Sequence, residues 1–218
     1  MHRPPDRVVR FTRAERWVHR ATAALVLTCL VTAACLYLAP LAELVGRRPL
    51  VVTVHVWCGL ALPVPLLLGL AFRAVRADVS RLSRFHPVDR QWLRAARAHA
   101  SHRPAGKFNA GQKLYAQWTL GAMMVIIGTG LLMWLTDLAP VAWRTGATFV
   151  HDWLAAAIGV VTAGHVRMAL RDPEARRGMR TGLVDRHWAE RAHPQWECDD
   201  PAAVREKQTL QEKQTLQE

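Results

Sequence analysis

Long uncharged stretches alternate with basic segments along the chain. Three of them are 22, 24 and 23 residues long and lie between Arg20 and Glu43, between Arg48 and Arg73, and between Lys113 and Asp137. Each is long enough to cross a hydrocarbon core of about 30 Å as an α-helix. Because the bilayer interior offers no water to unpaired backbone groups, helices are the expected form.

A fourth stretch is shorter, since only 14 uncharged residues separate Asp152 from Arg167. It spans a bilayer only when the helix begins near Ala147 and its polar residues lie at the interfaces. The pattern predicts an all-α fold, an integral membrane four-helix bundle with helices over 17–39, 50–73, 114–136 and 147–170. Pro63 and Pro65 are expected to kink the second helix.

Two regions follow from this pattern. Residues 1–197 form the transmembrane bundle. Residues 198–218 form a polar tail in which the hexapeptide KQTLQE occurs twice. A period of six fits neither a heptad nor globular packing, so the tail is expected to be disordered.

The basic residues indicate the topology. The chain has 218 residues, 51% of them hydrophobic, and a formal net charge of +12. Twenty Lys and Arg lie in segments 1–16, 74–113 and 171–197, against three in 40–49 and 137–146. The positive-inside rule therefore predicts that both termini are cytoplasmic in a multi-pass membrane protein. The charge also suits membrane lipid, and no aromatic-basic motif points to nucleic acid.

Histidines carry the candidate chemistry. There are ten. Six lie in cytoplasmic segments and are expected to be solvated: His2, His86, His99, His102, His187 and His193. The other four, His19, His55, His151 and His165, lie in or at the ends of membrane helices, where ionisable residues are rare and face a functional interior.

The spacing of these four histidines predicts two layers. His151 and His165 are 14 residues apart, about 21 Å along a helix axis and on nearly the same face. With both termini inside, His151 lies near the outer surface and His165 near the inner one. His19 begins the first helix at the inner side, and His55 lies a few residues into the second helix from the outer side. Depth therefore pairs His19 with His165, and His55 with His151.

Two pairs of imidazoles at two depths suit two b haems. Bis-histidine coordination fills both axial positions of the iron and suits electron transfer. Zinc is the competing candidate, but a zinc ion requires about four donor side chains around one point. No C-x-x-C-H motif occurs, so the haems are expected to be non-covalent. Arg16, Arg20 and Arg167 lie at the depth of the inner haem and are candidate partners of its propionates, although snorkelling to the interface explains them equally well.

Three motifs resemble a known family. They are RFTRAERWVH at 10–19, GKFNAGQK at 106–113 and the histidine pair in the last helix, and GLVDRHWAERAHPQWE at 182–197 resembles the same family's cytoplasmic end. The chain resembles, over roughly residues 8–197, the cytochrome b (gamma) subunit of membrane-bound respiratory formate dehydrogenase. It departs from that family in its tail and at Ala192.

The resemblance implies that His19, His55, His151 and His165 are the haem ligands. It also implies that Asn109, Ala110, Gly111 and Gln112, with His165, frame the head group of menaquinone or ubiquinone. From the residues alone, the alternative is that Asn109 caps the third helix. The implied partners are an iron–sulfur (beta) subunit and a molybdenum- or tungsten-pterin (alpha) subunit.

The function expected from this resemblance is a membrane-anchoring subunit that passes electrons from the outer iron–sulfur partner to quinone near the cytoplasm. The chain has no cluster-type cysteine motif and no pterin domain, so the formate-oxidising site must lie in a partner. Two alternatives remain open at this point. One is an equivalent subunit of a hydrogenase, thiosulfate reductase or other oxidoreductase complex. The other is a non-redox membrane transporter or assembly protein.

Overall fold

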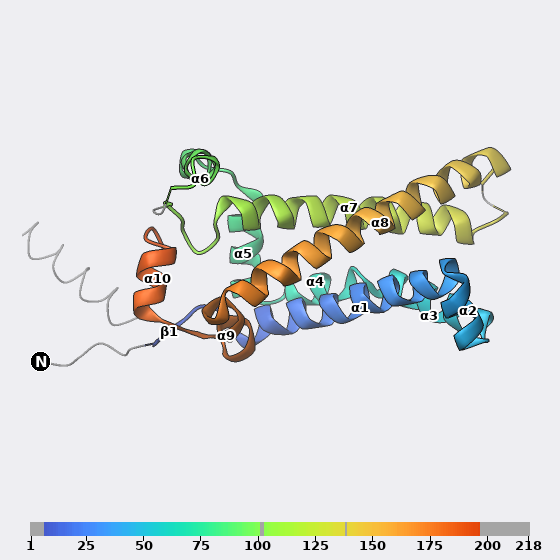
Figure 1. Ribbon diagram of the computed structural model, residues 1–218, viewed down its shortest axis with the longest axis horizontal. Helices are drawn as coiled ribbons and strands as arrows, with labels where there is room; N and C mark the ends of the chain where they lie inside the picture. Colours follow the sequence, from blue (N-terminus) through green and yellow to red (C-terminus); the bar gives the residue numbers. More distant parts are fainter. Residues whose placement is uncertain (1–6, 101–102, 138, 197–218) are drawn as a thin grey trace, which may run out of the picture.

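The computed structural model describes residues 7–100, 103–137 and 139–196 (Figure 1). The tail predicted at 198–218 lies outside the described residues. Within them, four helical segments are long and apolar enough to cross a membrane: α1 (Arg13–Tyr37), α3 with α4 (Arg48–Ala61 and Val64–Gly69), α7 (Ala110–Trp134) and α8 (Val141–Arg171). The four predicted spans are therefore confirmed by length and composition.

The second span is interrupted where the prolines lie. Pro63 and Pro65 each lack a backbone N–H, so α3 ends at Ala61 and α4 starts at Val64. The helix also ends at Gly69, before the predicted residue 73. At Gly69 the backbone lies against α1, because a Cβ placed there would come within 2.5 Å of a Val18 methyl group. A side chain at this position would push α4 away from α1.

The weakest predicted span is the longest helix. Helix α8 begins at Val141, six residues before the predicted start, directly after Pro140 at its N-cap. The uncharged run underestimates its length, because Trp143 and Arg144 are tolerated at the membrane boundary.

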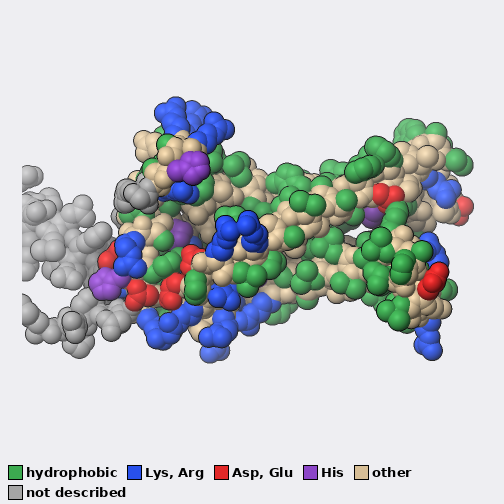
Figure 2. Space-filling view, in the orientation of Figure 1, with side chains coloured by type: hydrophobic (Ala, Val, Ile, Leu, Met, Phe, Trp, Pro, Cys, Tyr) green, Lys and Arg blue, Asp and Glu red, His purple; other side chains and the backbone are tan. Residues whose placement is uncertain are grey.

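Short elements complete both ends of the bundle. Helix α2 (Ala39–Val45) connects α1 to α3 at one end. The other end carries α5 (Arg73–Ser83), α6 (Pro87–Arg97), α9 (Pro173–Thr181) and α10 (Arg186–Ala192) (Figure 1). Figure 2 shows the Lys and Arg side chains gathered mainly at this end, while hydrophobic side chains cover the long helices. We name it the basic end.

The all-α prediction missed a small sheet at the basic end. Strands β1 (Arg7–Val9) and β2 (Leu183–Asp185) pair antiparallel, with Val8 opposite Val184. Both valines are buried. Three-residue strands have no detectable periodicity of their own, and this pair forms only because the two ends of the bundle domain meet.

Next to this sheet lies a group of side chains that we name the Arg10 clasp: the buried Arg10 and His193 with the half-buried Trp188 and Trp196. The Arg10 guanidinium lies 4.8 Å from the Trp188 ring and 5.8 Å from the Trp196 ring. One of its nitrogens donates to Nε2 of His193 at 2.9 Å, and Nδ1–H of His193 donates to the carbonyl of Gly106 at 2.6 Å. The clasp joins both ends of the bundle domain to the loop before α7.

The prediction that His193 is solvated was wrong, because only 4% of its surface is exposed. Burial, followed by the nearby Arg10 charge, lowers the pKa of His193 to about 4. A protonated ring could not accept from Arg10, so the clasp requires the neutral form.

We expect the clasp to weaken in acid. Between pH 6.5 and 4 the unfolded chain protonates this histidine while the folded chain does not, so stability falls as the pH falls through that window. The slope from one such group is at most about 1.4 kcal/mol per pH unit. His193→Gln keeps a donor and an acceptor without titrating, and should flatten the pH dependence of thermal unfolding in detergent. His187→Gln, at an exposed site, is the control, and equal slopes for wild type and His193→Gln would contradict the assignment.

Candidate functional site

Two pairs of histidine rings lie opposite each other, each pair formed by residues of two different helices. The ring centres of His19 and His165 are 6.3 Å apart, and those of His55 and His151 are 6.2 Å apart. Each pair joins two helices, α1 with α8 and α3 with α8. The rings that the sequence pairs by depth therefore lie opposite each other in the structure, while their role as inner and outer haem ligands stays a prediction.

The separations suit a metal ion between the rings. Two metal–nitrogen bonds of about 2 Å, with roughly 1.2 Å from each nitrogen to its ring centre, place the centres roughly 6.4 Å apart. Both pairs lie within 0.2 Å of this value. In the described part of the chain, no three His, Cys, Asp or Glu side chains form a group that could hold a metal ion. The geometry therefore fits a group that presents two axial positions, as haem iron does.

A threonine from the neighbouring helix orients each ring of the His55–His151 pair. Thr32 Oγ1 on α1 lies 2.8 Å from Nδ1 of His55, and Thr129 Oγ1 on α7 lies 3.1 Å from Nδ1 of His151. Both hydroxyls donate to carbonyl oxygens of their own helix, at 2.8 Å from Thr28 and 2.8 Å from Val125. Each hydroxyl therefore accepts from Nδ1–H, which leaves Nε2 as the nitrogen available to a metal ion.

The second pair has a different environment. Tyr115 on α7 stacks on the His165 ring, with centres 4.5 Å apart and planes at 10°. One turn further along α7, the Thr119 hydroxyl is buried without a hydrogen-bond partner among the described residues. An unpartnered buried hydroxyl costs free energy and marks a place where a polar group is expected. The two pairs thus differ in what surrounds their rings.

Two of the three arginines considered for the propionates have protein partners. Arg16 donates to the carbonyl of Arg180 at 2.7 Å, and Arg20 donates to the same oxygen at 2.9 Å. These contacts place two cations at the C-terminal end of α9, where the helix dipole favours them. Arg167 is exposed on α8. Contact of these arginines with a propionate stays a prediction.

The motif that precedes α7 forms a capping box. Asn109 N–H donates to Gln112 Oε1 and Gln112 N–H donates to Asn109 Oδ1, both at 2.9 Å. The NH₂ groups of both amides are not part of this cap. Ala110 is fully buried, and Gly111 lies against the Trp92 ring, where a Cβ would approach within 3.3 Å. Asn109 also lines a cavity of about 430 Å³, together with Trp92 and residues of α10 and the loop after α6.

Beyond the His55–His151 pair, a cavity of about 340 Å³ lies at the end opposite the basic end, lined by Met133, Val141, Arg144, Thr145 and Thr148. The Nε of Arg144 is buried, and no described residue is its hydrogen-bond partner. Arg144 precedes His151 by seven residues, two turns on the same face and about 10 Å along the axis. Arg48 precedes His55 by the same number.

Sequence reasoning missed Thr32, Thr129, Tyr115 and Arg144. A threonine within a membrane helix ordinarily bonds to its own backbone, so neither threonine stands out. The seven-residue spacing between an arginine and a following histidine, repeated at Arg48 and Arg144, was the available signal.

Four apolar helices that carry two opposed imidazole pairs define a class of protein, the membrane cytochromes b. The chain belongs to the prokaryotic cytochrome b561 family, whose model matches residues 10–182. Membership implies haem b as the cofactor and a multi-pass bacterial membrane protein.

Two curated relatives are similar over part of the chain. The "Formate dehydrogenase, nitrate-inducible, cytochrome b556(Fdn) subunit" of Escherichia coli (strain K12) is 31% identical over 98 residues, 42% of this chain and 43% of that protein. The "Formate dehydrogenase, cytochrome b556 subunit" of Haemophilus influenzae is 30% identical over 111 residues, 49% of this chain and 46% of that protein. The matches confirm the resemblance predicted from the motifs, and each covers less than half of the relative.

The threonine contacts yield a test. Loss of the group that orients a metal-ligating histidine typically lowers metal affinity roughly 10–100-fold. We therefore expect Thr32→Val and Thr129→Val each to lower the haem content of the purified protein. Thr28→Val is the control, because the Thr28 hydroxyl bonds only to the Ala24 carbonyl, at 2.8 Å. Haem content should be measured by pyridine haemochrome assay, and equal content in all four proteins would rule out the orienting role.

Proposed function

We propose that this chain is a di-haem cytochrome b that carries electrons across the membrane to quinone. His19 and His165 are the axial ligands of an inner haem, and His55 and His151 those of an outer haem. The observation that carries the proposal is the pair of ring separations, 6.3 Å and 6.2 Å, each of which accommodates an iron atom between two imidazoles.

Haem iron, when bound, takes up and releases one electron at a time. The protein's own contribution is to hold the ligands and set their protonation. Each imidazole must be neutral to ligate, and the apolar helices around it favour the neutral ring. Thr32 and Thr129 fix the outer rings in one tautomer, so no reorientation is needed when the iron changes charge.

The proposed orientation places the basic end in the cytoplasm and the protein in the bacterial inner membrane. The excess of Lys and Arg at that end supports it. The outer haem then lies near the periplasmic surface. Moving an electron inward from there stores about 2.3 kcal/mol per 100 mV of membrane potential.

The proposed partners are the other subunits of a formate dehydrogenase: an iron–sulfur subunit that delivers electrons at the outer side, and a catalytic molybdenum- or tungsten-pterin subunit. The names of the curated relatives support this choice. The proposed acceptor is menaquinone or ubiquinone, bound near Asn109, Ala110, Gly111, Gln112 and His165. The amide NH₂ groups of Asn109 and Gln112, which the capping box does not use, are suitable donors to a quinone carbonyl.

Haem stoichiometry tests the ligand assignment. We expect two haems per chain in the wild-type protein, visible as paired bands in a dithionite-reduced minus oxidised spectrum. His55→Ala should remove only the outer haem and His165→Ala only the inner haem, because each substitution removes one of two axial ligands. Potentiometric titration distinguishes the two. His187→Ala, at an exposed site, should retain both haems, and loss of the same haem in the first two variants would contradict the pairing.

We further propose that Arg144, with Arg48, binds the carboxylates of the outer haem. The buried and unpartnered Nε of Arg144, beside a cavity two turns beyond His151, supports this role. A nearby cation stabilises the reduced haem, because reduction removes one positive charge from the iron. This effect is small when the propionates are solvated and large when they are buried against the cation. We expect Arg144→Gln to lower the reduction potential of the outer haem while the inner haem keeps its value. Arg47→Gln is the matched control, and equal potentials in Arg144→Gln and wild type would remove Arg144 from the site.

A further inference from the structure

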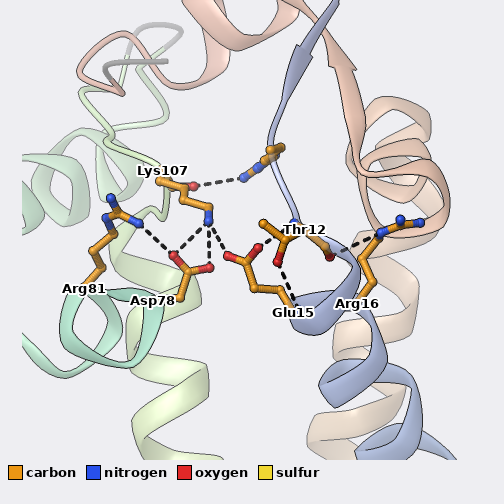
Figure 3. Close-up of polar contacts among 7 residues, drawn as sticks. Thr12, Glu15, Arg16, Asp78, Arg81 and Lys107 are labelled. Atoms are coloured by element: carbon orange, nitrogen blue, oxygen red, sulfur yellow. Dashed lines mark hydrogen bonds and ion pairs between the residues drawn. The ribbon is translucent and has the colours of Figure 1, made fainter. Parts of the chain in front are cut away.

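A buried ionic cluster of Lys107, Glu15 and Asp78 lies at the basic end (Figure 3). Lys107 Nζ lies 2.7 Å from Glu15 Oε1, and 2.8 Å and 2.7 Å from the two carboxylate oxygens of Asp78. The three side chains come from the loop before α7, from α1 and from α5. Each is at most 9% exposed.

The cluster contains more acid than base. Two buried carboxyl groups share one buried ammonium group. The remaining cations around Asp78 are Arg81, which is 46% exposed and donates to Asp78 Oδ1 at 2.9 Å, and Arg10 of the clasp, whose field also reaches Asp78. A second carboxylate charge is costly to hold in such a site, so one carboxyl group is poised to carry a proton.

Asp78 is the group that carries it. Burial and the neighbouring Glu15 carboxyl raise the pKa of Asp78 to about 7, against the opposing effect of Lys107. An acid of this strength is close to half protonated at neutral pH, which is the condition for both giving and taking a proton.

The position of the cluster links the cytoplasmic surface to the proposed quinone site. Arg81, which contacts the buried Asp78 carboxyl group, is itself partly exposed at the surface. Glu15 precedes His19 by four residues, one turn of α1 and about 6 Å along the axis. Lys107 precedes Asn109 by two residues, and its carbonyl accepts from Arg10 at 3.0 Å, so the clasp fixes the loop between the cluster and the quinone residues.

We propose that Asp78, with Lys107 and Glu15, is the proton relay that supplies the quinone from the cytoplasm. This inference rests on the proposed function, because it requires quinone and haem at the inner side.

The step balances as follows. Conversion of a quinone to a quinol takes two protons and two electrons, and each electron would come from one of two successive oxidations of the reduced inner haem. For each proton, the O–H bond of the Asp78 carboxyl group breaks and an O–H bond forms on a quinone oxygen, through Lys107, Glu15 or bound water. The Asp78 carboxylate then takes the next proton from cytoplasmic water.

A second buried ion pair provides the matched control. Lys113 Nζ on α7 lies 2.7 Å from Asp89 Oδ2 on α6, and their side chains are 8% and 3% exposed. This is one acid with one base, and no second carboxyl group among the described residues forms an ion pair with Lys113. A purely structural role for buried ion pairs would make Asp78→Asn and Asp89→Asn behave alike.

The test uses the haem-loaded full chain in detergent, reduced with dithionite and mixed with a short-chain water-soluble quinone. Stopped-flow absorption follows haem oxidation from pH 5 to 9. In the wild type we expect the rate to fall as the pH rises through about 7. Asp78→Asn should be slower by roughly tenfold or more and lose this inflection, Asp78→Glu should restore much of the rate, and Asp89→Asn should follow the wild type.

Difference infrared spectroscopy supplies a readout independent of turnover. The carbonyl stretch of a protonated carboxyl group should titrate near pH 7 in the wild type, shift in Asp78→Glu and disappear in Asp78→Asn. If Asp78→Asn fails to retain haem, the test is made with Asp78→Glu. In that variant the relay predicts a shifted pH inflection of the oxidation rate and a shifted carbonyl infrared band, and an unchanged inflection and band would overturn it.

Two failures are distinguishable. Wild-type haem that is not oxidised by quinone at any pH would overturn the quinone proposal and the relay with it. Wild-type oxidation with an unchanged rate and pH profile in Asp78→Asn, or equal slowing in Asp89→Asn, would overturn the relay alone.

Discussion

The rest of the structure depends on one constraint, the opposition of two imidazole rings in each histidine pair. Their ring centres are 6.3 Å and 6.2 Å apart, which leaves room for one metal ion between them. An imidazole held between apolar helices has two nitrogens that need partners, and each one left unpartnered away from water costs about 1–3 kcal/mol. At His55 and His151 a threonine hydroxyl satisfies one nitrogen of each ring. The iron proposed to lie between the rings would satisfy the other nitrogen of both rings at once.

This constraint explains the helix arrangement. Helix α8 contributes one histidine to each pair, so it must run the full depth of the bundle, and at 31 residues it is the longest helix described. Helices α1 and α3 supply the opposite rings, while α7 supplies Thr129 and Tyr115, which position the α8 rings. At the basic end, the Arg10 clasp and the Lys107 cluster fix the loop before α7. These contacts couple both ends of the bundle domain to the region proposed to bind quinone.

Much of this arrangement could be predicted from the sequence, because bilayer thickness and the helical rise limit the choices. Uncharged run lengths predicted the spans, and the 14-residue spacing of His151 and His165 predicted the two layers. The clasp and the β1–β2 pair could not be predicted, since they depend on how distant segments meet. The same reason made His193 a wrong prediction: nothing local distinguishes it from His187, and only the approach of Arg10 and two tryptophans buries it.

Low-temperature electron paramagnetic resonance with near-infrared magnetic circular dichroism of the oxidised protein tests the central claim most directly, because these spectra identify both axial ligands of each ferric haem. The proposed structure predicts two low-spin ferric haems per chain, each with two imidazole ligands. A high-spin signal from a haem with one open axial position, or a single haem per chain, would contradict it.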